Sequence, residues 1–227
     1  MADMTKPTLS DEQLAPAGLP MMQEDDVAQV SGTISIGVSW DASTRGKGGF
    51  LGKLSRKVGA DLDLAAVLFQ DQEPVVLCVG FTPELMNPLH DQPGDHSIEH
   101  TGDNETGEGS GDDEAITIHL DKIPAEFHRI VVEVAAFKDK NKKLGDAGFQ
   151  GANNVLFTVY DGAGAGAEKQ FCIRPSLLGT ENCVIVTTLD RVGNTTTWEM
   201  RKRKIRVNVK HGDLTDLIRK AAAVNNA

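Results

Sequence analysis

The stretch TISIGVSW, residues 33–40, shows the pattern that decides the fold. Its apolar side chains alternate with small or polar ones, and successive side chains of an extended chain point to opposite faces. Alternation over this length favours a half-buried β-strand over a helix. One face of the predicted strand receives Ile34, Ile36, Val38 and Trp40.

Nine further segments have the same character and are separated by turns that contain Gly, Asn or Asp. Alternation, or β-branched and aromatic content, identifies each of them as a strand. Short strands at this spacing predict an all-β fold, a β-sandwich of two packed and mostly antiparallel sheets. The predicted strands cover residues 61–69, 75–79, 116–120, 130–137, 155–160, 169–173, 183–189, 195–200 and 205–209.

The two ends of the chain differ from this pattern. Residues 1–28 contain prolines, scattered acids and no sustained period, so we expect a mobile acidic tail. At the other end Asp213 is a suitable N-cap for a short helix with Leu214 and Leu217 on one face. The predicted organisation is therefore the tail, a sandwich over residues 29–210, and a C-terminal helix and tail over residues 211–227.

Composition excludes several classes of function. The formal net charge is −10, which repels duplex DNA, so no nucleic-acid partner is expected. No apolar run approaches the roughly 20 residues of a transmembrane helix. The N-terminus lacks the layout of a secretory signal, so we expect a cytoplasmic protein. The three cysteines contain no CxxC pair, which excludes a cysteine-only zinc site and disfavours a disulfide framework.

The most informative stretch is EHTGDNETGEGSGDDE, residues 99–114, in which oxygen donors alternate with glycines. It lies in an acidic block, from Asp91 to Asp121, that contains ten acidic residues and neither Lys nor Arg. Calcium prefers six to eight oxygen ligands in irregular geometry, and glycines let a loop turn its carbonyls inward. The pattern predicts a calcium site, with candidate side-chain ligands Asp103, Asn104, Thr106, Asp112, Asp113 and Glu114.

A pair of acids on a predicted strand supports this site. Asp61 and Asp63 are two residues apart, so both carboxylates point to the same face. They repel each other at close range unless they share a counterion, and a metal ion held jointly with the acidic loop would relieve that repulsion. An EF-hand is excluded, because its sixth loop position would be Glu108 and a strand follows.

Other motifs have weaker support. HSIEH, residues 96–100, matches an inverted zinc-protease pattern, but Pro93 and Gly94 precede it and the segment is too broken for the required helix. The glycines of residues 162–166 predict a hairpin loop, because no helix follows them. Two basic segments, Arg45–Lys57 and Arg201–Lys210, are candidates for binding an acidic partner.

The acidic stretch also resembles a known signature. SIEHTGDNETGEGSGDDEAITIHLDKIP, residues 97–124, is similar to the signature of the TerD family of tellurium-resistance proteins, and residues 59–69 and 189–200 agree with its flanking strand and closing Arg…Trp hairpin. The resemblance implies a calcium-binding β-sandwich in a bacterial stress response that includes tellurite resistance. The metal ligands that it implies are Asp61, Asp63, Asp103, Asn104, Thr106, Gly107, Asp112, Asp113 and Glu114.

Three hypotheses for the function follow. The first is a non-catalytic calcium-binding protein of a stress response. The second is a metal-dependent hydrolase that uses the acidic cleft, for which His96 and His100 are the nearby candidate bases. The third is an adaptor that binds an acidic partner through its basic segments, with calcium in a structural role.

Overall fold

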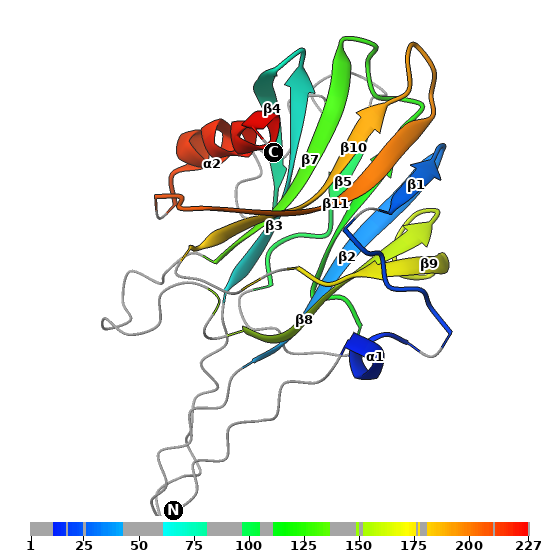
Figure 1. The fold of residues 1–227 in the computed structure, drawn as a ribbon, viewed down its shortest axis with the longest axis vertical. Coiled ribbons are helices and arrows are strands. Elements are labelled where there is room, and N and C mark those ends of the chain that lie inside the picture. Colours follow the sequence, from blue (N-terminus) through cyan, green and yellow to red (C-terminus); the bar gives the residue numbers. More distant parts are fainter. Residues whose placement is uncertain are drawn as a thin grey trace, which may run out of the picture.

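Two antiparallel sheets pack face to face in the computed structural model (Figure 1). The structure describes residues 11–16, 18–24, 26–42, 61–80, 97–104, 111–136, 149, 152–175, 177, 181–210 and 212–226. Within them, the first sheet has the strand order β1-β11-β10-β7-β3-β4 and the second β5-β6-β2-β8-β9. This arrangement confirms the predicted β-sandwich.

Every predicted strand segment has a counterpart among the described strands, and β1 and β5 are strands that the sequence did not predict. The first sheet consists of β1 (Val27–Val30), β3 (Leu62–Gln70), β4 (Glu73–Val79), β7 (Phe127–Ala136), β10 (Cys183–Arg191) and β11 (Trp198–Val207). The second consists of β2 (Thr33–Ala42), β5 (Ile98–His100), β6 (Glu114–His119), β8 (Ala152–Asp161) and β9 (Glu168–Ile173). The described helices are α1 (Asp11–Leu14), α2 (Leu214–Ala221) and the 3₁₀ turn η5 (Ala222–Asn226).

The main core lies between the two sheets. Alternation along each strand sends every second side chain into it, as the sequence predicts for Ile34, Ile36 and Val38 of β2. Trp198 of β11 and Phe157 of β8 are among its largest fully buried side chains. The side chains between those that enter the core point to the outer faces of the two sheets.

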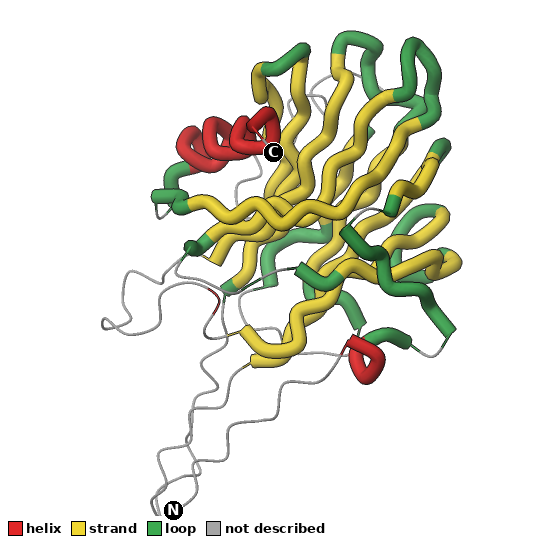
Figure 2. Tube along the Cα trace, viewed as in Figure 1, coloured by secondary structure: helices red, strands yellow, loops and turns green. Residues whose placement is uncertain are grey.

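A second apolar layer covers the outer face of the first sheet. The helix α2 lies over this face (Figure 2), and its Leu217 and Ala221 share one buried apolar cluster with Leu77 of β4 and with Val67 and Phe69 of β3. Asp213 is the N-cap, and its side chain accepts a hydrogen bond from the backbone N–H of Asp216, as predicted. Strand β3 is therefore buried on both faces, whereas its sequence pattern suggested one.

An arginine joins the β10–β11 hairpin to the turn before β7. The Arg191 guanidinium lies 4.3 Å from the centre of the Trp198 ring. Its nitrogens donate to the backbone oxygens of Ile123, Pro124 and Phe127 at 2.9 to 3.1 Å. This single side chain therefore ties the β10–β11 hairpin to the turn before β7, which gives the Arg…Trp pattern seen in the sequence a structural role.

Two features differ from the sequence-based expectation. Residues 195–200 and 205–209 were expected as two strands, but β11 is continuous and a bulge between Ile185 and Thr187 of β10 accommodates its bend. Part of the expected tail also makes regular contacts, because the backbone of Cys172 pairs with Pro20 and Met22. The basic segment Arg45–Lys57 has no described residues.

Glu133 of β7 is fully buried beside Cys183, whose thiol donates to its carboxylate across 3.7 Å. Burial raises the pKa of Glu133 to about 8 from an ordinary value of 4.5. The folded chain therefore binds a proton that the unfolded chain releases above pH 4.5, so this group's contribution to stability falls as the pH rises towards about 8.

We expect Glu133→Gln to remove this dependence, because the amide keeps an acceptor for Cys183 and cannot ionise. The free energy of unfolding of the wild type should lose up to about 1.4 kcal/mol per pH unit from this group, and the variant should lose less. Urea denaturation at several pH values measures the difference. The control is Glu168→Gln, an exposed acid of β9. Equal slopes in wild type and Glu133→Gln would contradict the prediction.

Candidate metal centre

The site begins at an unpaired stretch of strand edge. On one side, β3 pairs with β7 from its residue Leu62 onward. On the other side, β3 pairs with β4 only from Ala65 onward. The backbone N–H and C=O of one residue of an antiparallel strand point to the same side. Those of Leu64 are bound by side chains of the second sheet, since Glu114 Oε2 accepts from the N–H at 2.8 Å and His100 Nε2 donates to the C=O at 3.0 Å. We call this pair of contacts the Leu64 clamp.

His100 is fixed in a single neutral form. Its ring is fully buried, and burial lowers the pKa of His100 to about 4. Nδ1 accepts from the backbone N–H of Gly102 at 3.0 Å while Nε2 donates to Leu64. A Cβ atom on Gly80 would lie 2.6 Å from the ring, so only glycine fits at the end of β4. With both nitrogens occupied, His100 is neither a base nor a metal ligand in this arrangement.

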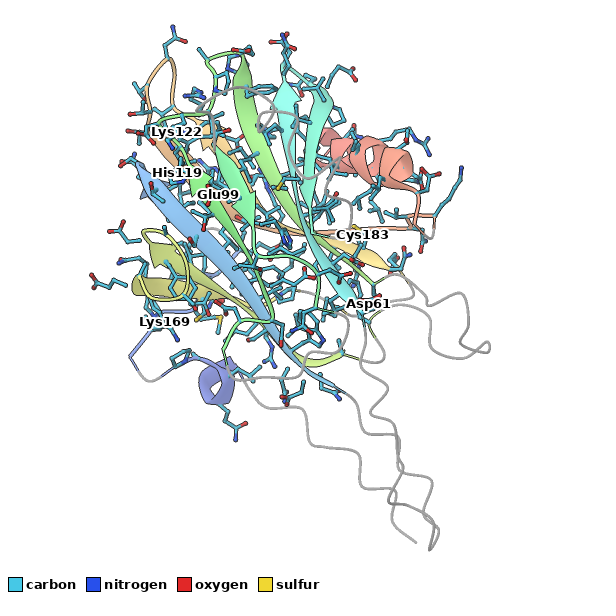
Figure 3. All side chains as sticks on the ribbon, turned by 180° about the vertical axis from the view of Figure 1, so that it is seen from behind. Asp61, Glu99, His119, Lys122, Lys169 and Cys183 are labelled. Carbon is cyan, nitrogen blue, oxygen red and sulfur yellow. The ribbon has the colours of Figure 1, made fainter. Side chains whose placement is uncertain are left out.

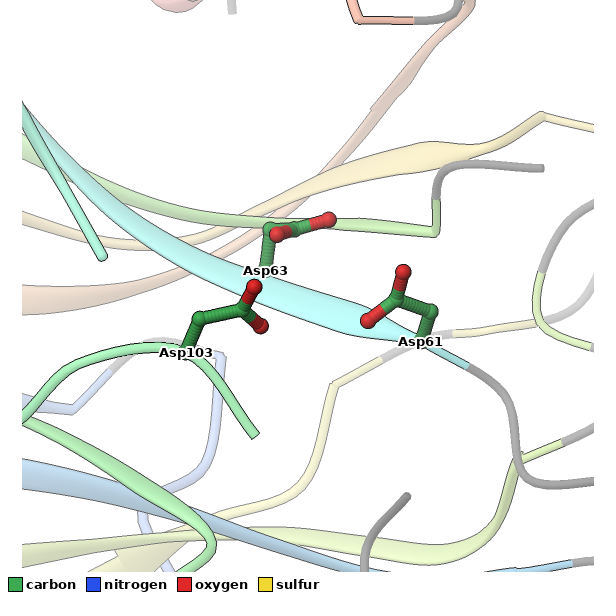
Figure 4. Close-up of side chains that lie close together, drawn as sticks. All are labelled: Asp61, Asp63 and Asp103. Carbon is green, nitrogen blue, oxygen red and sulfur yellow. The ribbon is translucent and has the colours of Figure 1, made fainter. Parts of the chain in front are cut away.

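Three carboxylates converge beside the clamp (Figure 4). Asp63 is the second residue of β3, Asp61 directly precedes that strand, and Asp103 comes from the loop after β5. One oxygen of each lies within 4.8 Å of the other two. We call these three residues the Asp triad. Because Leu62 and Leu64 enter the core, the strand presents its two aspartates on the other side.

Asp63 is the most constrained member of the Asp triad. Its side chain is 4% exposed, and Oδ2 has no hydrogen-bond partner among the described residues. Burial, followed by the charges of Asp61, Glu114 and Asp103, raises the pKa of Asp63 to about 9. An orphaned carboxylate oxygen of this kind costs free energy unless a cation or a proton occupies it.

Glu114 links the two halves of the site. Besides its bond to Leu64, its Oε1 accepts from the backbone N–H of Asn104 at 3.1 Å. Burial raises the pKa of Glu114 to about 8, although the two backbone N–H groups oppose that change. Since Leu64 adjoins Asp63 and Asn104 adjoins Asp103, this carboxylate sets the separation of the two aspartates.

The other predicted ligands divide between two faces. Asn104 donates from its side chain to Asp113 Oδ1 at 3.3 Å, and Asp113 Oδ2 accepts from the N–H of Trp40, so both lie next to Glu114. Asp112 instead lies over Gly37 on the outer face of the second sheet, where the Tyr160 hydroxyl donates to it at 2.6 Å. Asp112 is not part of the Asp triad.

Two further predicted ligands come from the middle of the acidic loop. Thr106 and Gly107 lie outside the described residues. Glu99 opens the acidic stretch, but it lies away from Asp61 (Figure 3). It belongs to β5, which shows that residues 98–100 form a strand and not the helix that a zinc protease requires.

Sequence reasoning missed the residues that position Asp112 and His100. Gly37 and Gly80 lack the Cβ atom that would collide with Asp112 and His100 respectively, and the Tyr160 hydroxyl donates to Asp112. A glycine inside a strand pattern is a general signal of close approach, and Gly37 within TISIGVSW is such a case. Nothing comparable in the sequence indicates that His100 binds the backbone of Leu64.

Comparison with known proteins supports the same family as the signature. The profile of the TerD domain matches residues 23–220. This chain belongs to the TerD domain family. Among the described residues of this TerD-family protein, no helix is long and apolar enough to cross a membrane.

Curated relatives match part of the sequence of this TerD-family protein. It is 33% identical over 117 residues to stress response protein SCP2 of Bacillus subtilis, covering 48% of this chain and 53% of that protein. It is 37% identical over 102 residues to tellurium resistance protein TerD of Serratia marcescens, covering 44% of this chain and 45% of that protein. The chain thus spans about half the length of these relatives.

Solved structures show the same fold over a longer span. A homologue of telluride resistance protein from Streptomyces coelicolor matches with a TM-score of 0.57 at 18% identity, over 82% of this chain and 96% of that one. The structure of a protein of unknown function matches with a TM-score of 0.52 at 17% identity, over 78% of this chain and 92% of that one.

The Leu64 clamp gives a prediction about stability. His100→Leu keeps an apolar side chain but leaves the C=O of Leu64 and the N–H of Gly102 without their partner. Each buried orphan costs about 1–3 kcal/mol, so the free energy of unfolding should fall by about 2–4 kcal/mol in urea denaturation. His128→Leu, at an exposed position of β7, is the control. A loss no larger than that of the control would show that the clamp contributes little.

Proposed function

We propose that this TerD-family protein is a non-catalytic, calcium-binding protein of a stress response, with the Asp triad at the centre of its metal site. The observation that supports it most directly is the buried Oδ2 of Asp63, which lacks a partner among the described residues and has two further carboxylates nearby. The names of two relatives, a stress response protein and a tellurium resistance protein, support the cellular setting.

The electrostatics of the Asp triad favour a divalent ion. Two unit charges about 4 Å apart repel by roughly 1–4 kcal/mol, depending on how much water reaches them. A cation between Asp61, Asp63 and Asp103 replaces that repulsion with attraction. Oxygens within 4.8 Å of one another are close enough for one ion whose bonds are about 2.3–2.6 Å long, the range for calcium.

The donor types favour calcium over zinc. The Asp triad offers only oxygen, whereas zinc sites in proteins usually contain nitrogen or sulfur. The neighbouring His100 has both nitrogens bound to backbone, and all three cysteines are buried, Cys78 and Cys183 of them in the two apolar clusters. Calcium is also the ion that tolerates an irregular set of loop oxygens.

The rest of the coordination shell comes from the acidic loop in this proposal. Calcium takes six to eight oxygens, which is more than three monodentate carboxylates supply. Glu114, Asp113 and Asn104 lie beside the Asp triad, and Thr106 and Gly107 complete the set implied by the family resemblance. Asp112 would have to leave Tyr160 to join it, so we place it outside the first shell of ligands.

A hydrolase fits the described residues less well. Metal-dependent hydrolysis needs a base or nucleophile beside the metal. Of the two histidines considered for this role, His100 is occupied and His96 lies outside the described residues. We therefore assign no reaction to the acidic cleft.

The state of the three cysteine thiols is relevant to the cellular location and to the function of the protein. Cys78, Cys172 and Cys183 are free and buried, which fits the reducing cytoplasm that we propose as the location. Burial raises the pKa of all three thiols, so the reactive thiolate is scarce. A role in tellurium resistance would then not proceed through thiol chemistry of this chain.

We expect a thiol-specific reagent to modify none of the three cysteines rapidly in the native protein and all three in urea. The physical reason is burial, because each cysteine is 0% exposed. Mass spectrometry after timed labelling counts the modified sites, and the urea sample is the positive control. Rapid labelling of Cys172 or Cys183 without urea would reopen a thiol-based role.

Calcium should raise the melting temperature after chelator is removed, because it binds the folded site and hardly binds the unfolded chain. At a hundredfold excess over the dissociation constant one site adds about 2.7 kcal/mol. Asp63→Asn should weaken calcium binding at least tenfold while leaving the metal-free protein no less stable, since it also removes repulsion.

Calorimetry and melting curves with calcium, magnesium and chelator test this expectation. Asp121→Asn, at an exposed turn position, is the charge-matched control. Asp112→Asn separates the Asp triad from the outer face, and we expect it to have a smaller effect than Asp63→Asn. Unchanged calcium affinity in Asp63→Asn, or tighter binding of zinc than of calcium, would overturn the proposed site.

A further inference from the structure

The basic run of β11 divides into two sets with different surroundings. Lys202 Nζ donates to the backbone oxygen of Met22 at 3.2 Å, and Lys204 Nζ pairs with Glu24 at 2.6 Å. These two lysines therefore bind the chain's own N-terminal segment, whose backbone also pairs with Cys172 of β9. Both ammonium groups therefore already have partners within the chain.

Arg201 and Arg203 occupy the opposite face of the strand. Met200 enters the core, so Arg201 lies on the outer face of the first sheet, directly across from Thr188 of β10. Arg203 is on the same face, because its Nε donates to the Thr188 hydroxyl at 3.1 Å. Arg129 joins them from β7, where it lies across from Asp190 of β10. We call Arg129, Arg201 and Arg203 the arginine face.

The carboxylates on this surface are already paired. Asp190 forms an ion pair with Arg129, and Glu199 forms one with Arg201 at 2.7 Å. The Thr188 hydroxyl donates to Asp190 at 3.4 Å and so connects Arg203 to that pair only indirectly. The arginine face with its two acids therefore has three positive and two negative charges.

Arg203 is the member without a carboxylate of its own. Among the described residues, its two terminal amino groups have no hydrogen-bond partner. Burial lowers the pKa of Arg203, Asp190 opposes that change, and the nearby charges of Arg129 and Arg201 add to it. A partly desolvated guanidinium with neighbours of the same charge favours an anion at its free edge.

We propose that Arg203, flanked by Arg201 and Arg129, is a binding site for a phosphate-type oxyanion on the outer face of the first sheet. The two terminal amino groups of a guanidinium match two oxygens of a phosphate, and Arg201 has further N–H groups beside the one used by Glu199. The proposal uses no residue of the Asp triad, so it does not depend on calcium binding.

The surrounding charge selects a small anion over a polyanion. The net charge of the chain is −10, and Asp190 and Glu199 border the site on either side. A nucleic acid would bring many phosphates close to this negatively charged surface and would be repelled. A single phosphate group would contact mainly the one excess positive charge of the arginine face. The ligand is therefore free phosphate or one phosphate group on a small molecule.

The test is a titration of the full chain with inorganic phosphate and, separately, with O-phosphoserine, at constant ionic strength, followed by NMR chemical shifts. We expect saturable shifts around β10 and β11 in the wild type. Arg203→Gln should weaken binding about tenfold or more, the value of a charge-assisted bidentate contact. Arg206→Gln, an exposed arginine on the same strand, should leave binding unchanged.

A gain-of-binding variant separates this site from a structural role of Arg203. Glu199→Gln removes the competing carboxylate from Arg201 and should tighten phosphate binding. If both ligands bind, inorganic phosphate alone is enough for recognition. If only O-phosphoserine binds, the site recognises a phosphate monoester. No saturable shift with either ligand, or equal weakening in Arg203→Gln and Arg206→Gln, would overturn the proposal.

Discussion

At Leu64 the two sheets are joined by hydrogen bonds that lie outside their own ladders. Glu114 and His100, both from the second sheet, bind its N–H and C=O where β4 no longer pairs with β3. Unsatisfied backbone groups at a buried strand edge are costly, so the missing strand partner is replaced by two side chains. The same two contacts bring the loop that contains Asp103 against the strand that contains Asp61 and Asp63.

This arrangement gives the candidate metal site a rigid part and an adjustable part. Asp63 belongs to a strand that is buried on both faces, and Glu114 is fixed by backbone donors at both of its oxygens. Asp103 belongs to a loop. A site built in this way can accept an ion by moving the loop while the sheet geometry is conserved, which suits the flexible coordination of calcium better than the strict octahedron of magnesium.

The fold was predictable because most strands have one face in the main core, and alternation is the direct consequence of that burial. The aspartate pair was predictable for the same reason, since a spacing of two fixes the face. The loop ligands were less predictable. Asp112, Asp113 and Glu114 are consecutive in the acidic stretch, yet Asp112 is bound by Tyr160 on one face while Glu114 faces the other sheet. Composition identifies oxygen donors, but the strand that begins at Glu114 decides where each of them points.

Strand β1 pairs with β11, and the helix α2 that follows β11 covers the outer face of the same sheet. The first strand of the described fold thus obtains its partner only from the last. On the ribosome, β1 waits for nearly the whole chain to be synthesised before its hydrogen bonds can form, and the outer surface of β3 stays open until α2 emerges. Long-range pairing of this kind slows folding and leaves strand edges exposed for longer. The sandwich therefore cannot complete its hydrogen bonding and its outer apolar layer until β11 and α2 have been synthesised.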